Sequence, residues 1–143
     1  MEKQKVLFIQ NSDGILQTEG LWCIKLGDNY VIDNIPFIAK RVSLGDTVKV
    51  EYDPEDGGYY FDDFVAVSGN TTLRIYFNDV VLIEETRNQL GLFGCESEVF
   101  LSRKIMGVNV PSTVTYKPIK NFLSKGEILG KWSYEESCLA HEI

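Results

Sequence analysis

The sequence has little of what marks secreted, membrane-spanning or metal-binding proteins. Its three cysteines, Cys23, Cys95 and Cys138, are odd in number and too far apart for a CxxC metal clip. Such thiols are typical of a reducing compartment, where they fill space as small hydrophobes. No apolar run reaches the roughly 18 residues of a membrane span, and the N-terminal run 6–9 is shorter than a secretory signal core. We therefore expect a cytoplasmic protein without a membrane segment.

Histidine is scarcer still, since His141 is the only one and lies close to the C-terminus. A Ser-His or Cys-His pair needs its base held within hydrogen-bond reach of the nucleophile. Chain ends are usually poorly ordered, so we expect His141 to be an incidental surface residue. The sequence therefore predicts a protein that is not an enzyme and that carries no cofactor.

Positive charge is also in short supply, with 14 basic residues against 21 acidic ones and a net charge of −7. Binding to nucleic acid or to an anionic membrane surface requires a positive field. RNA-binding domains also stack bases on aromatic residues of a central strand, and the segment 105–110 has none. We expect neither direct nucleic-acid binding nor membrane binding.

The acidity is concentrated in the first half of the chain. Residues 1–69 contain twelve acidic and six basic residues, whereas residues 70–143 contain nine and eight. Ser68-Gly69-Asn70 is a turn-forming cluster between two apolar runs. We expect two subdomains, an acidic all-β one at 1–69 and an α+β one at 70–143.

The first half alternates short apolar runs with turn signals, which is typical of antiparallel strands. Gly27-Asp28-Asn29 and the segment 54–58 are hairpin turns, because Gly and Asn adopt positive φ at little cost. The expected strands lie at residues 6–9, 21–26, 30–32, 48–52 and 59–67. Helical spacing is confined to residues 38–42. Five short strands predict a small antiparallel barrel or a curled sheet.

In the second half the spacing of apolar residues changes twice from that of a strand to that of a helix. This pattern predicts a β-α-β-β-α-β unit of the ferredoxin-like type. Asn78 and Asp79 are good N-cap residues for a helix whose buried face carries Val80, Ile83 and Leu90. A second helix is expected to begin near Pro118, to bury residues 119, 122 and 123, and to end at Gly126. The expected strands lie at residues 73–77, 95–100, 106–110 and 132–135.

The most visible candidate site is a run of six carboxylates within 13 residues, interleaved with aromatic side chains. We call these the hairpin carboxylates: Glu51, Asp53, Glu55, Asp56, Asp62 and Asp63. Their spacing does not match a calcium-binding loop, so we expect no metal. Two alternatives stay open, a solvated loop that maintains solubility and a docking face for a basic protein.

In the docking alternative the side chains that bind the partner are five of these carboxylates together with two tyrosine anchors, which suit interfaces. The expected partner-binding set is Asp53, Glu55, Asp56, Tyr59, Tyr60, Asp62 and Asp63.

A second set of residues carries a resemblance that covers roughly residues 5–139. The first landmarks are Leu21-Trp22, Leu26-Gly27-Asp28, Asp33-Asn34-Ile35-Pro36-Phe37 and Leu44-Gly45-Asp46. Later ones are Thr72-Leu73-Arg74, Gly94-Cys95, and Gly130 followed by Trp132, Tyr134-Glu135-Glu136 and Cys138-Leu139. With them the sequence resembles the bacterial domain-of-unknown-function 4265 family. The resemblance implies a short bacterial cytoplasmic protein and assigns no catalytic residue.

From these patterns we expect a non-enzymatic, acidic protein-binding module, in its most concrete version an immunity protein that neutralises a basic toxin such as a nuclease. The alternative is a sensor of a small molecule or nucleotide, or a weak enzyme, with its site between the two halves. Its cleft would be lined by Trp22, Arg74, Tyr76 and Trp132. Segment 33–37 is expected to shape a sharp corner.

Overall fold

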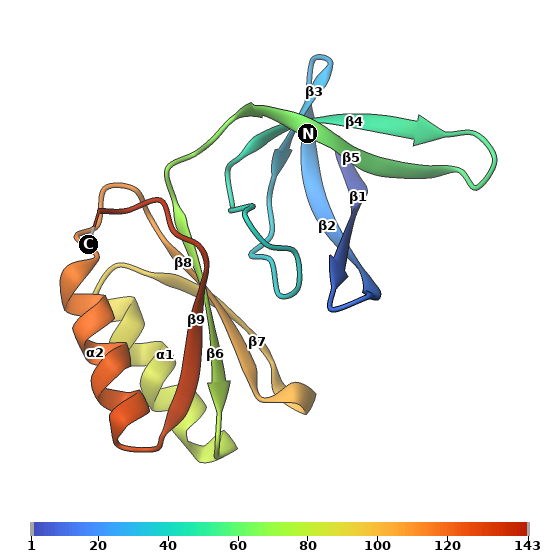
Figure 1. The fold of residues 1–143 in the computed structure, drawn as a ribbon. Helices are drawn as coiled ribbons and strands as arrows, with labels where there is room; N and C mark the ends of the chain where they lie inside the picture. Colours follow the sequence, from blue (N-terminus) through green and yellow to red (C-terminus); the bar gives the residue numbers. More distant parts are fainter. Residues whose placement is uncertain (1, 143) are drawn as a thin grey trace. The chain divides into compact units, whose positions relative to one another are not determined.

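The computed structural model describes residues 2–142 and divides into two compact units. The first unit ends at Ser68 and the second begins at Gly69. Both are built on predominantly antiparallel sheets, and the two α-helices belong to the second unit (Figure 1). The chain is therefore a mixed α+β protein.

The first unit is a five-stranded sheet that curls into a small barrel. Its strands are β1 (Lys3–Ser12), β2 (Ile15–Leu26), β3 (Asn29–Ile32), β4 (Thr47–Asp53) and β5 (Gly58–Ala66). Consecutive strands pair antiparallel, and a parallel bridge between Leu7 and Tyr60 joins β1 to β5. The predicted curled sheet is confirmed, although β1 and β2 are longer than the apolar pattern indicated. Their turn uses Asp13 and Gly14, both at positive φ.

The core of the first unit consists of side chains that alternate inward along these strands. Val6, Leu21, Cys23, Ile32 and Val48 are almost fully buried in it. Such alternation leaves the other face of each strand for polar residues.

The loop between β3 and β4 contains no helix, so the helical expectation for residues 38–42 is wrong. The backbone N–H groups of Phe37, Ile38 and Ala39 donate to the carboxylate of Glu19 on β2, at 2.8–2.9 Å. This carboxylate pairs three consecutive backbone donors of the loop and so holds it without a helix. At segment 33–37 the chain turns sharply, and the Asn34 side chain accepts a hydrogen bond from the Trp22 backbone.

The second unit has a four-stranded antiparallel sheet with both α-helices on one face (Figure 1). Its elements are β6 (Thr71–Phe77), the 3₁₀ turn η1 (Val80–Leu82), α1 (Ile83–Leu92), β7 (Glu96–Phe100), the 3₁₀ turn η2 (Leu101–Arg103), β8 (Ile105–Val110), α2 (Lys117–Ile128) and β9 (Trp132–Cys138). The strand order is β7-β8-β6-β9, and every pair is antiparallel.

The core of the second unit lies between this sheet and the helices. Leu73 and Ile75 on β6 and Val108 on β8 are fully buried against Leu90 of α1 and Leu123 of α2. The alternate residues of the same strands therefore face the side of the sheet that carries no helix.

Two helix boundaries differ from those expected. The Asp79 side chain caps η1 rather than α1, and Val80 is consequently 47% exposed instead of buried. Gly126 does not end α2 but lies inside it, directly beneath the ring of Trp132. The chain leaves the helix at Gly130, which has positive φ.

Candidate functional site

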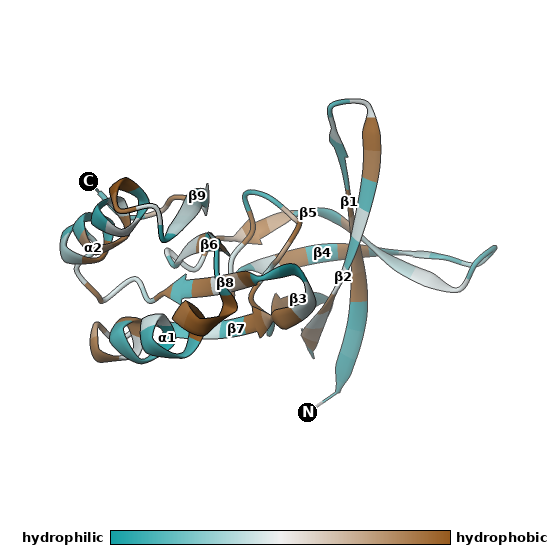
Figure 2. Ribbon diagram, turned by 90° about the horizontal axis from the view of Figure 1, so that it is seen from below, coloured by the Kyte–Doolittle hydropathy of each residue, from teal (hydrophilic) through white to brown (hydrophobic). Residues whose placement is uncertain are grey.

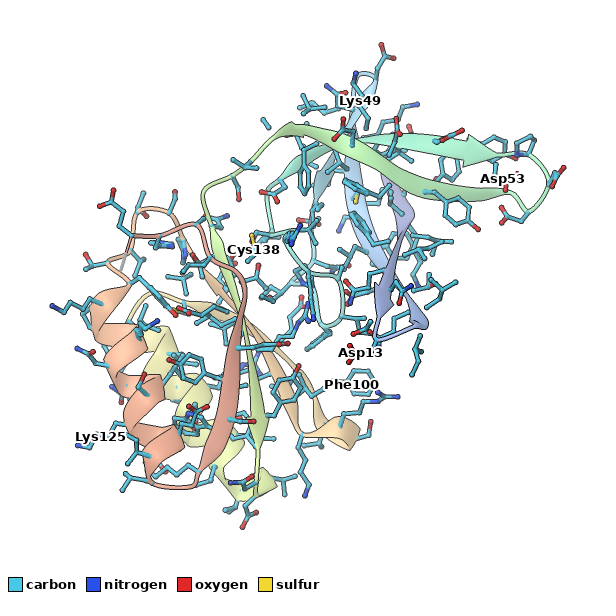
Figure 3. All side chains as sticks on the ribbon, in the orientation of Figure 1. Asp13, Lys49, Asp53, Phe100, Lys125 and Cys138 are labelled. Atoms are coloured by element: carbon cyan, nitrogen blue, oxygen red, sulfur yellow. The ribbon has the colours of Figure 1, made fainter. Side chains whose placement is uncertain are left out.

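All six hairpin carboxylates lie on β4, on β5 or in the turn between them. This hairpin projects past the other strands of its unit (Figure 1), and Figure 2 shows that its turn is hydrophilic. Figure 3 places Asp53 near the tip and Lys49 farther back along β4. Residues that are dispersed over 13 positions of sequence thus come together on one two-stranded ribbon.

The tip of the hairpin is held together by its own carboxylates. Asp53 Oδ1 accepts a hydrogen bond from the Glu55 backbone N–H at 2.9 Å, and Asp56 Oδ1 accepts one from the Gly58 N–H at 2.7 Å. Gly57 supplies the positive φ that the turn needs. Asp53 and Asp56 are therefore structural acceptors as well as charges.

One face of the hairpin is acidic. Glu51 pairs with Tyr60 across the strands, and Lys49 pairs with Asp63. Asp53 follows Glu51 by two residues, so it shares the same face. We call Glu51, Asp53, Tyr60 and Asp63 the acidic face.

A bulge in β5 makes this arrangement possible. Val50 pairs with Phe61 while Lys49 pairs with Asp63, so Asp62 is an extra residue opposite the break. The extra residue resets the alternation, which puts Tyr60 and Asp63 on the same face.

The opposite face of the hairpin is aromatic. Phe61 stacks on Phe8 with ring centroids 5.0 Å apart, which joins the hairpin to the barrel core. Farther out, the rings of Tyr52 and Tyr59 lie 4.9 Å apart, and Tyr52 is 51% exposed. Tyr59 and Tyr60, which we expected to act together as anchors, point to opposite faces because successive strand residues alternate.

Tyr60 on the acidic face is bonded to the tip of the hairpin, and a shallow recess lies beside it. The Tyr60 hydroxyl donates to Asp56, and this bond, with that from the Gly58 N–H, lowers the pKa of Asp56. The same bond is the main cause of the raised pKa of Tyr60. A pocket of about 440 Å³ is lined by Glu51, Asp53 and Tyr60, with Tyr52 and Pro54.

No ion pair involves a hairpin carboxylate within residues 2–142. Lys49 lies opposite Asp63 in the ladder and shares this face, without forming an ion pair with it. The negative charge of this region is thus not neutralised by the chain's own cations.

The four residues proposed to line a cleft lie in three different environments. On the face of the second sheet that carries no helix, Arg74 is 2% exposed and lies 3.2 Å from Glu135, which also accepts the Tyr76 hydroxyl. Trp22, on β2 of the first unit, is 45% exposed, with the Lys5 ammonium 5.8 Å from its ring centroid.

Trp132 lies on the other side of the second sheet, and the expectation that it lines an open cleft is wrong. It is 4% exposed, its ring packs against Phe77 and Phe122, and its Nε1–H donates to the Leu123 carbonyl at 2.9 Å. Trp132 therefore belongs to the core and shares no surface with Arg74 or Tyr76.

His141 is held in place, contrary to the expectation of a frayed terminus. Its Nδ1 lies 2.6 Å from Thr71 Oγ1, and its Nε2 lies 2.9 Å from the Pro111 carbonyl oxygen. A carbonyl can only accept, so Nε2 carries a proton and the Thr71 hydroxyl donates to Nδ1. Thr71 and His141 are 70 positions apart, so no pattern in the sequence could have predicted this contact.

The Thr71–His141 pair is not a catalytic dyad. Thr71 is 0% exposed, and its oxygen already accepts hydrogen bonds from the backbone N–H groups of Ala140 and His141. A nucleophile must be reachable by substrate. This pair is a structural latch that fastens the tail to β6.

The cysteines were expected to be buried as small hydrophobic residues, and two of the three are. Cys23 and Cys95 are buried, and burial raises their thiol pKa values to about 12 and about 11. Both thiols are therefore protonated and unreactive at neutral pH. Cys138 is only partly buried.

Residues 2–142 contain no group of three or more His, Cys, Asp or Glu side chains arranged to hold a metal ion. None of the helices described is long and apolar enough to cross a bilayer.

Comparisons with known proteins agree with the resemblance drawn from the sequence. The model of a domain of unknown function, DUF4265, matches residues 19–134. The fold is similar to that of a hypothetical protein from Neisseria gonorrhoeae described as a novel crystal structure, with a TM-score of 0.87 and 24% identity over 99% of each chain. No curated protein matches the chain.

Proposed function

The chain belongs to the DUF4265 family, a domain family of unknown function, and from the chemistry of its hairpin we propose that it is a non-enzymatic module that binds a basic protein. The observation that carries the proposal is the gathering of six carboxylates on one projecting hairpin, without an ion pair inside the described chain. Complementary charge accelerates encounter and fixes the register of two partners. The acidic face would be the centre of the contact.

The aromatic face of the hairpin supports the same proposal. Tyr52 is 51% exposed beside Tyr59, and tyrosine contributes a large apolar area with a polar tip to protein interfaces. Because these rings lie on the face opposite Tyr60, a partner that wraps the hairpin would contact both the charges and the rings.

In its most concrete form, the module is a cytoplasmic immunity protein that inhibits a nuclease toxin. A nuclease needs positive charge to hold its polyanionic substrate. An acidic hairpin of this kind would occupy that charged site and exclude the nucleic acid. The net charge of −7 favours such a partner by long-range attraction.

Co-expression with the product of the adjacent open reading frame, followed by affinity capture and a nuclease assay, tests this proposal. We expect the two proteins to co-purify and the nuclease to be inhibited. The triple variant Glu51→Gln, Glu55→Gln, Asp62→Asn keeps the side-chain hydrogen bonds of the turn, which Asp53 and Asp56 make. It should weaken capture of the partner.

A matched control removes the same number of exposed carboxylates elsewhere, with Asp13→Asn, Asp28→Asn and Glu85→Gln. The control should retain both capture and inhibition. A neighbouring product that is neither captured nor inhibited contradicts the proposal.

We also propose that the second unit is a ferredoxin-like split β-α-β arrangement. The order of its elements, its strand order β7-β8-β6-β9 and the antiparallel pairing of all neighbours support this assignment. In that arrangement β7 and β9 are the edge strands.

A further inference from the structure

The outward face of β1 and β2 carries apolar side chains, where the solvated face of an antiparallel sheet usually carries polar ones. Leu7 and Ile9 of β1 alternate with core residues and therefore point outward. Leu16 and Trp22 of β2 point to the same side, because their partners in the ladder are two residues away from Ile9 and Leu7. Ile9, Leu16 and Trp22 are 55, 71 and 45% exposed. We call Leu7, Ile9, Leu16 and Trp22 the apolar strip.

The apolar strip is continuous along the two strands, and Figure 2 shows apolar segments on this β1–β2 ribbon. In the register of the ladder, Leu16 is the diagonal neighbour of Ile9, and Trp22 is the diagonal neighbour of Leu7. Diagonal neighbours on one face lie about 7–8 Å apart, which long side chains can span. Single exposed apolar residues are ordinary, whereas a contiguous group of them marks a contact surface.

One row of residues joins the apolar strip to the acidic face. Glu51 lies opposite Tyr60 in the β4–β5 ladder. Tyr60 is bridged in turn to Leu7, which lies opposite Gly20 of β2. Neighbouring strands are about 4.8 Å apart, so the row from β4 to β2 spans about 14 Å. The acidic face and the apolar strip thus form one surface of the first unit.

The lysines of β1 beside this surface are already engaged within the chain. Gly20 leaves room for the Lys5 side chain to lie across β2, because a Cβ at Gly20 would be 2.5 Å from Lys5 Cε. The Lys5 ammonium is 5.8 Å from the centroid of the Trp22 ring. Lys3 is 3.2 Å from Asp33. A second copy of the chain, with its net charge of −7, would therefore be repelled by a face that is already acidic.

We propose that the acidic face and the apolar strip are a single interface, which a basic protein covers with cationic side chains at Glu51 and Asp53 and with an aliphatic or aromatic side chain at Trp22. This inference rests on the proposed function and states what the partner must carry besides charge. Protein interfaces combine desolvated apolar contacts with a polar rim, and aromatic anchors carry much of their binding energy. Trp22 is that anchor here, because the partner would displace the flexible Lys5 side chain and bury the ring.

The test uses the full chain and two peptides of equal charge. The mixed peptide is acetyl-Arg-Lys-Arg-Gly-Ser-Leu-Phe-Leu-amide, and in the charge-only peptide three serines replace its last three residues. Titration calorimetry measures affinity, and the chemical shifts of backbone and indole N–H groups locate the contacts. Both peptides should shift Glu51 and Tyr60. The mixed peptide should also shift Leu7 and Trp22, and it should bind at least about tenfold more tightly.

Trp22→Ala removes the anchor and leaves the carboxylates in place. It should lower the affinity for the mixed peptide to that for the charge-only peptide, whose own affinity should not change. The matched control is Leu92→Ala, which truncates an exposed apolar side chain of α1 and should change neither affinity. If Trp22→Ala does not fold, Ile9→Ser replaces it, because Ile9 is exposed on the same strip, and the affinity for the mixed peptide should again fall.

Equal affinity for the two peptides, or an undiminished affinity of Trp22→Ala for the mixed peptide, would overturn the inference and leave the acidic face as a site for charge alone. Binding of neither peptide up to about 1 mM would overturn the inference together with the proposed recognition of basic proteins. Shifts of Trp22 that depend on the concentration of the protein alone would show a second copy on the strip and would refute the basic partner. Conversely, tighter binding of the mixed peptide through Trp22, without capture of the product of the adjacent open reading frame, would sustain the interface and refute only that product as its partner.

Discussion

The carboxylates of β9 and those of the β4–β5 hairpin serve different purposes. On β9, Glu135 accepts hydrogen bonds from Arg74 and from the Tyr76 hydroxyl, at 3.2 and 2.7 Å. Its neighbour Glu136 is 3.2 Å from the Lys120 ammonium and accepts the buried Tyr116 hydroxyl. The hairpin carboxylates have no such cations and bond only to a hydroxyl and to the backbone of their own hairpin.

This difference distinguishes carboxylates that stabilise the fold from carboxylates that are available to bind a partner. A carboxylate that is bonded to cations and buried hydroxyls of its own chain stabilises the fold. Its loss leaves those buried donors without an acceptor, which costs free energy. A carboxylate without an internal cation keeps its charge for an external one. Substitutions of the β9 carboxylates should therefore lower stability, and substitutions of the hairpin carboxylates should lower binding.

The largest effect is expected where the second core is tightest, at Gly126→Ala. The new Cβ would meet the Trp132 ring at 2.0 Å, so helix and strand must separate. Overpacking of this kind should lower the free energy of unfolding by about 3 kcal/mol, measured by urea denaturation. The control Gly91→Ala should raise it by about 0.5–1 kcal/mol. Equal effects of the two substitutions would refute this account of the core.

Glu136→Ala should come next, with a loss of about 2 kcal/mol, because it leaves the Tyr116 hydroxyl without its acceptor. Tyr116 is 2% exposed, so water cannot replace that acceptor freely. The hairpin counterpart, Glu55→Ala, should change stability by less than about 0.5 kcal/mol. A comparable loss of stability in both variants would contradict the distinction between the β9 carboxylates and the hairpin carboxylates.

Alkaline pH should destabilise the second unit through Tyr116. Burial, and then the hydrogen bond to Glu136, raises its pKa above the ordinary value of 10.0. The unfolded chain therefore loses this proton first, and stability falls as pH rises above about 10, by at most about 1.4 kcal/mol per pH unit. Tyr116→Phe should flatten this fall in pH-dependent denaturation, whereas Tyr59→Phe on the hairpin should not. An unchanged slope in Tyr116→Phe would contradict the assignment.

The smallest effect on stability is expected for the triple variant Glu51→Gln, Glu55→Gln, Asp62→Asn. These side chains are exposed, and none of them makes a hydrogen bond within the tip. The free energy of unfolding should remain within about 0.5 kcal/mol of the parent. A loss above about 2 kcal/mol would show that the hairpin carboxylates support the fold.

Local patterns predicted most of the secondary structure because strand alternation and turn residues are properties of neighbouring positions. The turn at residues 54–58 and the first-unit strands followed from such signals. The bulge at Asp62 did not, because it depends on how two strands pair. Without knowledge of the bulge, Tyr60 and Asp63 could not be assigned to the same face.

The errors at the candidate sites arose from side-chain contacts that the alternation of residues along one strand or helix does not reveal. Trp132 is buried because Gly126 leaves room for its ring, a fit that periodicity cannot reveal. His141 is ordered because Thr71, far away in sequence, offers a buried hydroxyl. Strand alternation could have placed Arg74 and Trp132 on different faces only if the register of β6 and β9 had been known.

The most direct test of the hairpin as a recognition surface is the association rate constant with the basic product of the adjacent gene, measured at low and physiological ionic strength. The account predicts a rate that falls steeply with salt. The triple variant should associate about tenfold more slowly at low salt, with an unchanged midpoint of thermal unfolding. A rate that is indifferent both to salt and to the triple variant would contradict it.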